Sequence, residues 1–213
     1  MQITDFNLYL ITDRHQTGVR PLIEVVRKAL DGGVKAVQLR EKDLAGAELY
    51  RLAVEMRLLT SEYGARLIIN DRSDIAQAVD ADGVQIGINS LPVADVRRLL
   101  GSGRLIIYSA HTVAEAEQAR ADGADMVTFG PVYHTPSKAC LGEPYGVEKL
   151  AEAARSLNMP VIALGGIKPD NIPDTLSAGC SGVAVISAVL SAADPREAAS
   201  SMLKKIEEYV QYH

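Results

Sequence analysis

Short apolar runs alternate eight times with longer amphipathic segments along this chain of 213 residues, and this alternation constrains the fold more than any other feature. The apolar runs, which we predict to be strands, cover residues 8–12, 36–40, 66–70, 83–86, 105–108, 126–129, 160–164 and 182–185. Predicted helices cover residues 21–30, 46–63, 73–79, 91–101, 113–122, 147–157 and 169–178, and a last helix begins near residue 194. Continuous apolar runs are typical of strands buried on both faces of a parallel sheet.

A repeat of about 26 residues favours a closed (β/α)8 barrel over an open, doubly wound sheet. A doubly wound sheet would need a glycine fingerprint after its first strand, and Asp13-Arg14-His15 supplies none. The length suits one domain of α/β class with one sizeable core. We therefore predict a single TIM-barrel domain over residues 1–213.

Composition excludes several classes of partner. The net charge of -5 leaves no basic stripe for nucleic acid. Cys140 and Cys180 form neither a disulfide framework nor a metal-binding spacing, which is typical of a cytoplasmic protein. No apolar run approaches the roughly 20 residues that span a bilayer, and the first residues lack the pattern of a signal peptide. The sequence predicts a cytoplasmic protein that binds neither nucleic acid nor membrane. A homo-oligomer is compatible with it, but the number of subunits is left open.

Two cations follow the second predicted strand, at the barrel end where active sites lie. Strand alternation places Gln38, Arg40 and Lys42 on one side of the chain. Two cations at a barrel mouth favour anion binding, and arginine can hold a phosphate through two hydrogen bonds. The alternative is that they form surface ion pairs with Glu41 or Asp43.

Asp71, after the third predicted strand, is the candidate metal ligand. Mg²⁺ commonly takes one or two carboxylates together with substrate oxygens. The alternative is that Asp71 caps the helix that begins near Ser73. The fourth strand and the residues after it carry only neutral polar groups, Gln85, Asn89 and Ser90, so they supply no second carboxylate.

Polar groups also follow the fifth and sixth predicted strands. Ser109 is a candidate pocket hydroxyl, and His111 either transfers a proton or orders its loop. The sixth strand ends at a glycine and a proline, and the polar residues of the loop after it are His134, Thr135, Ser137 and Lys138. Hydroxyl and ammonium donors suit a phosphate ester, although an ordinary solvated loop has the same composition. Whether the loop over residues 131–145 closes on a ligand is left open.

The seventh and eighth predicted strands favour a phosphate site. Gly165 and Gly166 let the backbone approach a ligand closely, and amides from Ile186 to Ala188 can point at an anion. Residues 187–190 have the length of a short extra helix, the element against which such a phosphate commonly rests.

Together these segments resemble the thiamine phosphate synthase/TenI family. The resemblance covers nearly the whole chain, in the family's order, through residues 9–13, 37–42, 68–71, 109–111, 130–138, 165–167 and 185–187. Members of the family are (β/α)8 barrels. The synthase joins hydroxymethylpyrimidine diphosphate to thiazole phosphate and releases pyrophosphate with the help of Mg²⁺. The TenI branch includes a tautomerase that moves a proton on a thiazole carboxylate phosphate.

The resemblance also implies roles for individual residues. The groups that would hold the pyrimidine diphosphate are Gln38, Arg40, Lys42, Asn70 and Lys138. Asp71 would be one Mg²⁺ ligand, and Ser109 would meet the pyrophosphate. The thiazole phosphate end would be lined by Thr135, Ser137, Gly166 and Ser187.

Some positions depart from the synthase pattern. Synthases generally carry a histidine in the fourth strand and an aspartate, the second Mg²⁺ ligand, where this chain has Gln85 and Ser90. Those two residues look more like the TenI branch, which leaves Mg²⁺ binding in question. The catalytic histidine of TenI proteins is also absent, because Pro131 stands in its place, and His111 and His134 remain as acid/base candidates.

Three cations and Asp71 favour the synthase, because they can stabilise the charge on departing pyrophosphate and a tautomerase needs only a positioned base. We therefore predict a transferase of the thiamine-phosphate synthase type that acts on small phosphorylated pyrimidine and thiazole substrates. A TenI-like tautomerase and a non-catalytic protein that binds thiazole phosphate remain alternatives.

Overall fold

The structure is a computed structural model that describes residues 5–135 and 143–212. Its strands are β1 (Leu8–Ile11), β2 (Ala36–Leu39), β3 (Arg66–Asn70), β4 (Gly83–Ile86), β5 (Leu105–Ala110), β6 (Met126–Phe129), β7 (Val161–Leu164) and β8 (Gly182–Val185). Each strand pairs in parallel with its neighbours in sequence, and β1 pairs with β8, so the sheet closes into a barrel. The predicted (β/α)8 TIM barrel is confirmed.

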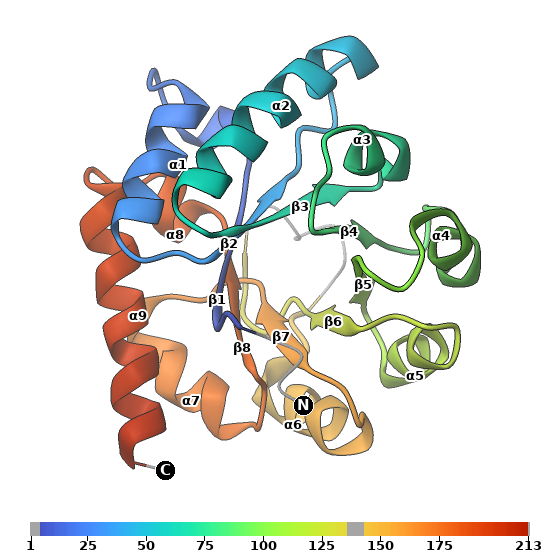
Figure 1. The fold of residues 1–213 in the computed structure, drawn as a ribbon. Coiled ribbons are helices and arrows are strands. Elements are labelled where there is room, and N and C mark those ends of the chain that lie inside the picture. Colours follow the sequence, from blue (N-terminus) through green and yellow to red (C-terminus); the bar gives the residue numbers. More distant parts are fainter. Residues whose placement is uncertain (1–4, 136–142, 213) are drawn as a thin grey trace.

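Helices surround this barrel (Figure 1). They are α1 (Leu22–Asp31), α2 (Gly46–Glu62), α3 (Ser73–Ala78), α4 (Val93–Leu100), α5 (Val113–Ala121), α6 (Gly146–Ser156), α7 (Ile172–Ser177), α8 (Ser187–Leu190) and α9 (Pro195–Tyr212). Short 3-10 turns, Arg14–Gln16 and Pro169–Asn171, follow β1 and precede α7. None of the helices in the described part of the chain is long and apolar enough to span a membrane.

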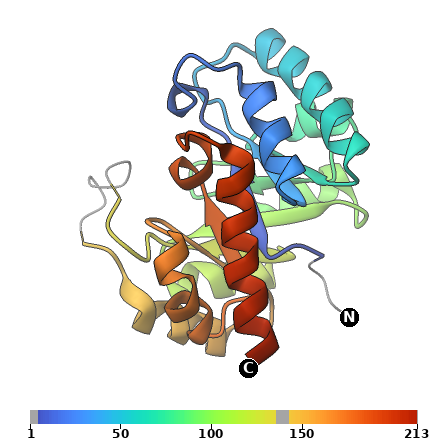
Figure 2. The same cartoon turned by 90° about the vertical axis from the view of Figure 1, so that its left-hand side faces the viewer.

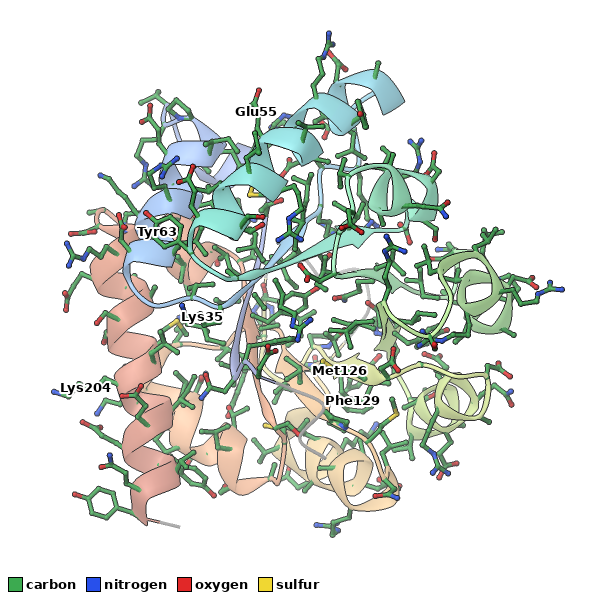
Figure 3. The ribbon with its side chains drawn as sticks, viewed as in Figure 1. Lys35, Glu55, Tyr63, Met126, Phe129 and Lys204 are labelled. Carbon is green, nitrogen blue, oxygen red and sulfur yellow. The ribbon has the colours of Figure 1, made fainter. Side chains whose placement is uncertain are left out.

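The strands separate two apolar layers. Inside the barrel, side chains from every strand except β4 pack together, and this inner group includes Tyr9, Ile68 and Met126. The outward side chains, Phe129 among them, pack under the helices in a larger cluster. Because successive strand residues face opposite sides, two buried layers require the continuous apolar runs seen in the sequence. Figure 3 labels Met126 and Phe129, at the two ends of β6.

The two ends of the barrel differ. Figure 2 shows the barrel from the side, with the first described residues at one end and the residues that follow β6 at the other. The carboxyl ends of the strands therefore gather on the face away from the start of the chain. Glu55 on α2 and Lys204 on α9 point outwards from the ring of helices in Figure 3.

Element boundaries differ little from those predicted. Strand β5 runs on to Ala110 because Ser109 and Ala110 pair with residues of β6. The helix predicted over residues 169–178 divides into the 3-10 turn and α7, with proline in the first turn of each. The 3-10 turn after β1 was not predicted. Its amino end is capped by the Asp13 side chain, which accepts a hydrogen bond from the backbone of His15.

Candidate functional site

A buried polar network fills the barrel interior near the carboxyl ends of the strands. The Gln38 amide nitrogen donates to the Tyr9 hydroxyl at 3.0 Å and to Gln85 Oε1 at 2.5 Å. The Gln85 amide nitrogen donates in turn to Ser109 Oγ at 2.8 Å and to Thr128 Oγ1 at 3.1 Å. Burial raises the pKa of Tyr9 well above its usual range, so its hydroxyl stays protonated. Five strands are thus joined by neutral hydrogen bonds.

One acceptor of this network is unused. Gln38 is 1% exposed, and its Oε1 has no hydrogen-bond partner among the described residues. A buried carbonyl without a donor costs free energy, so this oxygen favours a guest or a water molecule that supplies an N–H or O–H group. The predicted role of Gln38 in binding is consistent with this orphan acceptor.

The cations Arg40 and Lys42 lie just beyond β2. The strand ends at Leu39, and exposure increases from buried Gln38 through half-buried Arg40 to exposed Lys42. The Arg40 backbone N–H donates to Thr12 Oγ1 at 2.9 Å, which ties this turn to the end of β1.

The carboxylates beside these cations are bound by a different residue. Arg14 donates to Asp43 through both terminal nitrogens, at 2.5 and 2.7 Å, and to Glu41 Oε2 at 3.2 Å. Within the described residues, neither Arg40 nor Lys42 takes part in a salt bridge. The alternative that both cations form ion pairs with Glu41 or Asp43 is therefore wrong.

Asp71 stands exposed at the end of β3 in a left-handed backbone conformation, with φ of 59°. Asn70 Nδ2 donates to Asp71 Oδ2 at 2.8 Å, and Ser90 Oγ donates to Asp71 Oδ1. The N-cap of α3 is Arg72, and no side chain caps this helix. The alternative that the Asp71 side chain caps the helix is therefore wrong.

The residues around Asp71 supply a single carboxylate for a metal ion. No group of three or more His, Cys, Asp or Glu side chains suited to a metal occurs within residues 5–135 and 143–212. A protein cage is thus lacking in that part of the chain. One exposed carboxylate next to Asn70 and Ser90 nevertheless fits Mg²⁺, because this ion keeps several waters and takes its other oxygens from phosphates.

His111 orders the loop that it begins. Its Nδ1 lies 3.0 Å from the carbonyl oxygen of Gly130, and its backbone N–H donates to Glu115 Oε2 at 2.8 Å. The ring packs edge-on against Tyr145, with 6.5 Å between the ring centres. These contacts support the structural alternative, and proton transfer by His111 stays a prediction. His134, the other candidate acid/base group, is exposed.

A cavity of about 810 Å³ opens over the ends of β7 and β8. Its lining includes the predicted site residues His134, Thr135, Gly165, Gly166, Ile186 and Ser187. Gly166 has φ of 68°, and a Cβ there would lie 2.7 Å from the Cβ of Tyr133, so this backbone position requires glycine. The backbone N–H of Tyr133 donates to the Gly165 carbonyl at 3.0 Å, which brings the segment after β6 onto the cavity wall.

Apart from His111, the predicted site residues in the described part of the chain fall into two groups at one end of the barrel. The first group, at the ends of β2 to β5, consists of Gln38, Arg40, Lys42, Asn70, Asp71 and Ser109. The second group lines the cavity. Ser137 and Lys138 lie outside the described residues. A guest with a diphosphate and a guest with a phosphate ester could therefore bind side by side, each beside groups suited to its charge.

Sequence reasoning missed some residues around these groups. Tyr9 and Thr128 complete the buried network, and Arg14 binds the rim carboxylates. Alternation along β6 could have found Thr128, because Met126 faces the interior and Thr128 lies two positions further on. Nothing in the sequence pairs Arg14 with Asp43, because the two are 29 positions apart and meet only when β1 lies beside β2.

Comparison with known proteins agrees with this geometry. Residues 8–189 match the family model described as thiamine monophosphate synthase. A Geobacter sulfurreducens protein, provisionally named a thiamine-phosphate synthase, is 57% identical over 203 residues, which cover 95% of each chain. The thiamine-phosphate synthase of Roseiflexus castenholzii is 44% identical over 195 residues, covering 92% of this chain and 86% of the relative.

A solved structure is similar over the full length. The thiamine phosphate pyrophosphorylase from Pyrococcus furiosus superposes with a TM-score of 0.90 at 38% identity, and the match covers 99% of this chain and 100% of that one. Because the family model and full-length relatives agree with the barrel and with the motifs at its rim, this protein belongs to the thiamine monophosphate synthase family.

Proposed function

We propose that this protein is a thiamine-phosphate synthase, a transferase that joins hydroxymethylpyrimidine diphosphate to thiazole phosphate and releases pyrophosphate. The observation that carries the proposal is the pair Arg40 and Lys42, two cations with no salt bridge among the described residues, at the same barrel end as the cavity over β7 and β8. A tautomerase needs no such cations, because its reaction releases no polyanion.

The diphosphate binds on the β2 to β5 side. In thiamine phosphate, the methylene carbon of the pyrimidine is bonded to the thiazole nitrogen. Forming this carbon–nitrogen bond requires breaking the bond between the same carbon and an oxygen of the diphosphate. Negative charge then builds on the departing pyrophosphate. Arg40 and Lys42 hold this charge, and Ser109 donates a hydrogen bond to it. Positioned cations are among the largest contributions to such a step.

The pyrimidine ring lies over the buried network. Gln38 Oε1 accepts a hydrogen bond from the ring's amino group, which satisfies the orphan acceptor. The thiazole phosphate occupies the cavity on the β7 and β8 side. Gly165 and Gly166 allow close approach of the backbone, and Thr135 and Ser187 offer hydroxyls.

Mg²⁺ would be held by Asp71, the diphosphate and water. When bound, the ion supplies positive charge that lowers the cost of forming pyrophosphate. Asn70 and Ser90 orient the Asp71 carboxylate through their hydrogen bonds to its two oxygens.

The test is to incubate the purified protein with both phosphorylated substrates and Mg²⁺, and to follow thiamine phosphate and pyrophosphate. The two products are expected in equal amounts. In a parallel reaction the protein receives a thiazole carboxylate phosphate, which a tautomerase would isomerise. Isomerisation without condensation would identify the tautomerase, and tight binding of thiazole phosphate without either reaction would identify a non-catalytic binder.

A substitution at Ser90 tests the metal site. Ser90→Asp places a second carboxylate beside Asp71, because the two side chains already share a hydrogen bond. We expect the Mg²⁺ concentration for half-maximal activity to fall by about fivefold to tenfold, as an added carboxylate ligand tightens Mg²⁺ binding. Ser90→Asn is the matched control, since it has the same shape without the charge. Equal Mg²⁺ dependence in the two variants would show that the ion does not lie between these positions.

A further inference from the structure

The rim after β2 carries charges of alternating sign. Arg40, Glu41, Lys42 and Asp43 are consecutive, so each cation has a carboxylate as its neighbour in sequence. Such neighbours would ordinarily compete with a phosphate for the cations. The structure instead gives both carboxylates to Arg14, on the 3-10 turn after β1.

The contacts of Arg14 differ in depth. The Glu41 carboxylate is 1% exposed and accepts hydrogen bonds from Thr12 Oγ1 at 2.6 Å, from the Arg14 backbone N–H at 3.1 Å and from Arg14 Nη1 at 3.2 Å. Asp43 is 53% exposed and receives both arms of the guanidinium, together with His15 Nε2 at 2.9 Å. Hydrogen bonds from Arg14 and then from His15 hold the pKa of Asp43 below its usual range, so this carboxylate is charged at neutral pH.

We infer that Arg14 is a positioning residue that keeps Arg40 and Lys42 available for the diphosphate by binding the two carboxylates beside them. This inference rests on the proposed synthase function. Both terminal nitrogens of Arg14 bond these carboxylates, so the role assigned to Arg14 is to act through Arg40 and Lys42. The guanidinium fork is suited to the task because it is planar, always charged and able to bind one carboxylate through two bonds while reaching a second.

Charge balance explains why the arrangement matters. The three cations and two carboxylates of this rim leave one net positive charge. Loss of Arg14 removes that surplus and also takes two hydrogen bonds from exposed Asp43, which keeps only its contact with His15 among the described residues. Asp43 follows directly after Lys42 and can then pair with it. Thr12 and the backbone N–H at position 14 still hold Glu41, so Asp43 is the carboxylate that competes.

The experiment measures binding of inorganic pyrophosphate, with Mg²⁺ present, by titration calorimetry. Arg14→Met is expected to weaken binding by about threefold to tenfold, the effect of one unit charge a few ångströms from a polyanion near a solvated surface. Arg14→Met with Asp43→Asn restores the net charge and removes the competitor, so its affinity should return to within about twofold of wild type.

Controls separate pairing at the rim from overall charge. Arg66 binds Asp5 through a similar bidentate contact at the start of β3, at the other end of the barrel. Arg66→Met should leave pyrophosphate affinity unchanged, and Asp5→Asn should fail to rescue Arg14→Met. Arg14→Lys keeps a positive charge for buried Glu41 but lacks the guanidinium fork, so it replaces Arg14→Met in the experiment if Arg14→Met does not fold. Asp43→Asn should restore the pyrophosphate affinity of Arg14→Lys as well.

Undiminished affinity in a folded Arg14 variant, or no rescue by Asp43→Asn, would overturn the inference. Wild-type protein that does not bind pyrophosphate would also overturn it. Wild-type protein that binds pyrophosphate but forms no thiamine phosphate would refute the proposed synthase function and leave the inference about Arg14 standing, because the binding measurements do not require turnover. In an active enzyme, the KM for the pyrimidine diphosphate should rise in Arg14→Met while the KM for thiazole phosphate does not.

Discussion

Replacement of Gln85 by leucine tests whether the buried network supports the barrel as well as its site. Gln85 is 4% exposed; it accepts one hydrogen bond from Gln38 and donates one each to Ser109 and Thr128. Leucine has a similar volume but removes all three bonds. The Gln38 N–H that faces it then loses its acceptor in a buried position, which makes the change costly.

The size of the effect follows from these contacts. One buried N–H without an acceptor costs about 1–3 kcal/mol. The hydroxyls of Ser109 and Thr128 add less, because they lie 3.4 Å apart and can bond to each other. We expect Gln85→Leu to lower the free energy of unfolding by about 2 kcal/mol, which shifts a urea midpoint by roughly 1 M for a slope near 2 kcal/mol/M.

Urea unfolding followed by circular dichroism measures this shift. Gln85→His is the matched variant, because imidazole retains one donor and one acceptor; it should lose about half as much stability as the leucine variant. A leucine variant as stable as wild type would refute the reasoning. It would mean that the Gln38 N–H finds another acceptor and that the network does not hold Gln38 in place.

Two further predictions concern single residues. Gly166→Ala should lower the free energy of unfolding more than Gly64→Ala. Both glycines have a left-handed backbone, which costs alanine about 1 kcal/mol. Only at position 166 would the added Cβ also collide with Tyr133, whereas no atom lies within 4 Å of a Cβ at position 64. Equal urea midpoints would contradict this. Burial raises the pKa of Cys180 to about 11, so at pH 8 only about a thousandth of it is thiolate. In Cys140→Ser protein, a thiol reagent should therefore modify Cys180 at least about 100-fold more slowly when the protein is folded than in urea. Similar rates would show that the thiol is accessible.

The strands were predictable because each one is a local signal. An apolar run of four or five residues, followed by a glycine or a polar group, marks both the strand and its carboxyl end, as at Asn70 and at Gly130. Once a barrel is assumed, all these ends meet on one face. Arg40 and Gly166 could therefore be assigned to the same end of the barrel from the sequence alone. The family resemblance added the substrates and was confirmed at the level of the family.

Side-chain partners were not predictable in the same way. The contact of Gln38 with Gln85 spans 47 positions and depends on the register of β2, β3 and β4. Whether the Asp71 side chain caps a helix or accepts hydrogen bonds from Asn70 and Ser90 depends on its left-handed backbone, which sequence alone leaves open. Such contacts form or fail on differences of a few tenths of an ångström in the spacing of elements that are far apart in the chain.

The eight repeats, the parallel sheet and the residue types at its carboxyl ends could all be read from the sequence, because they depend on the spacing of apolar and polar residues along one chain. Which charges pair could be learned only from the folded protein. Glu41 follows Arg40, and Lys42 lies between Glu41 and Asp43 in sequence, yet β1 lies beside β2 and brings Arg14 to those carboxylates instead. Ion pairs are set by proximity and geometry in space, and barrel closure defines that space.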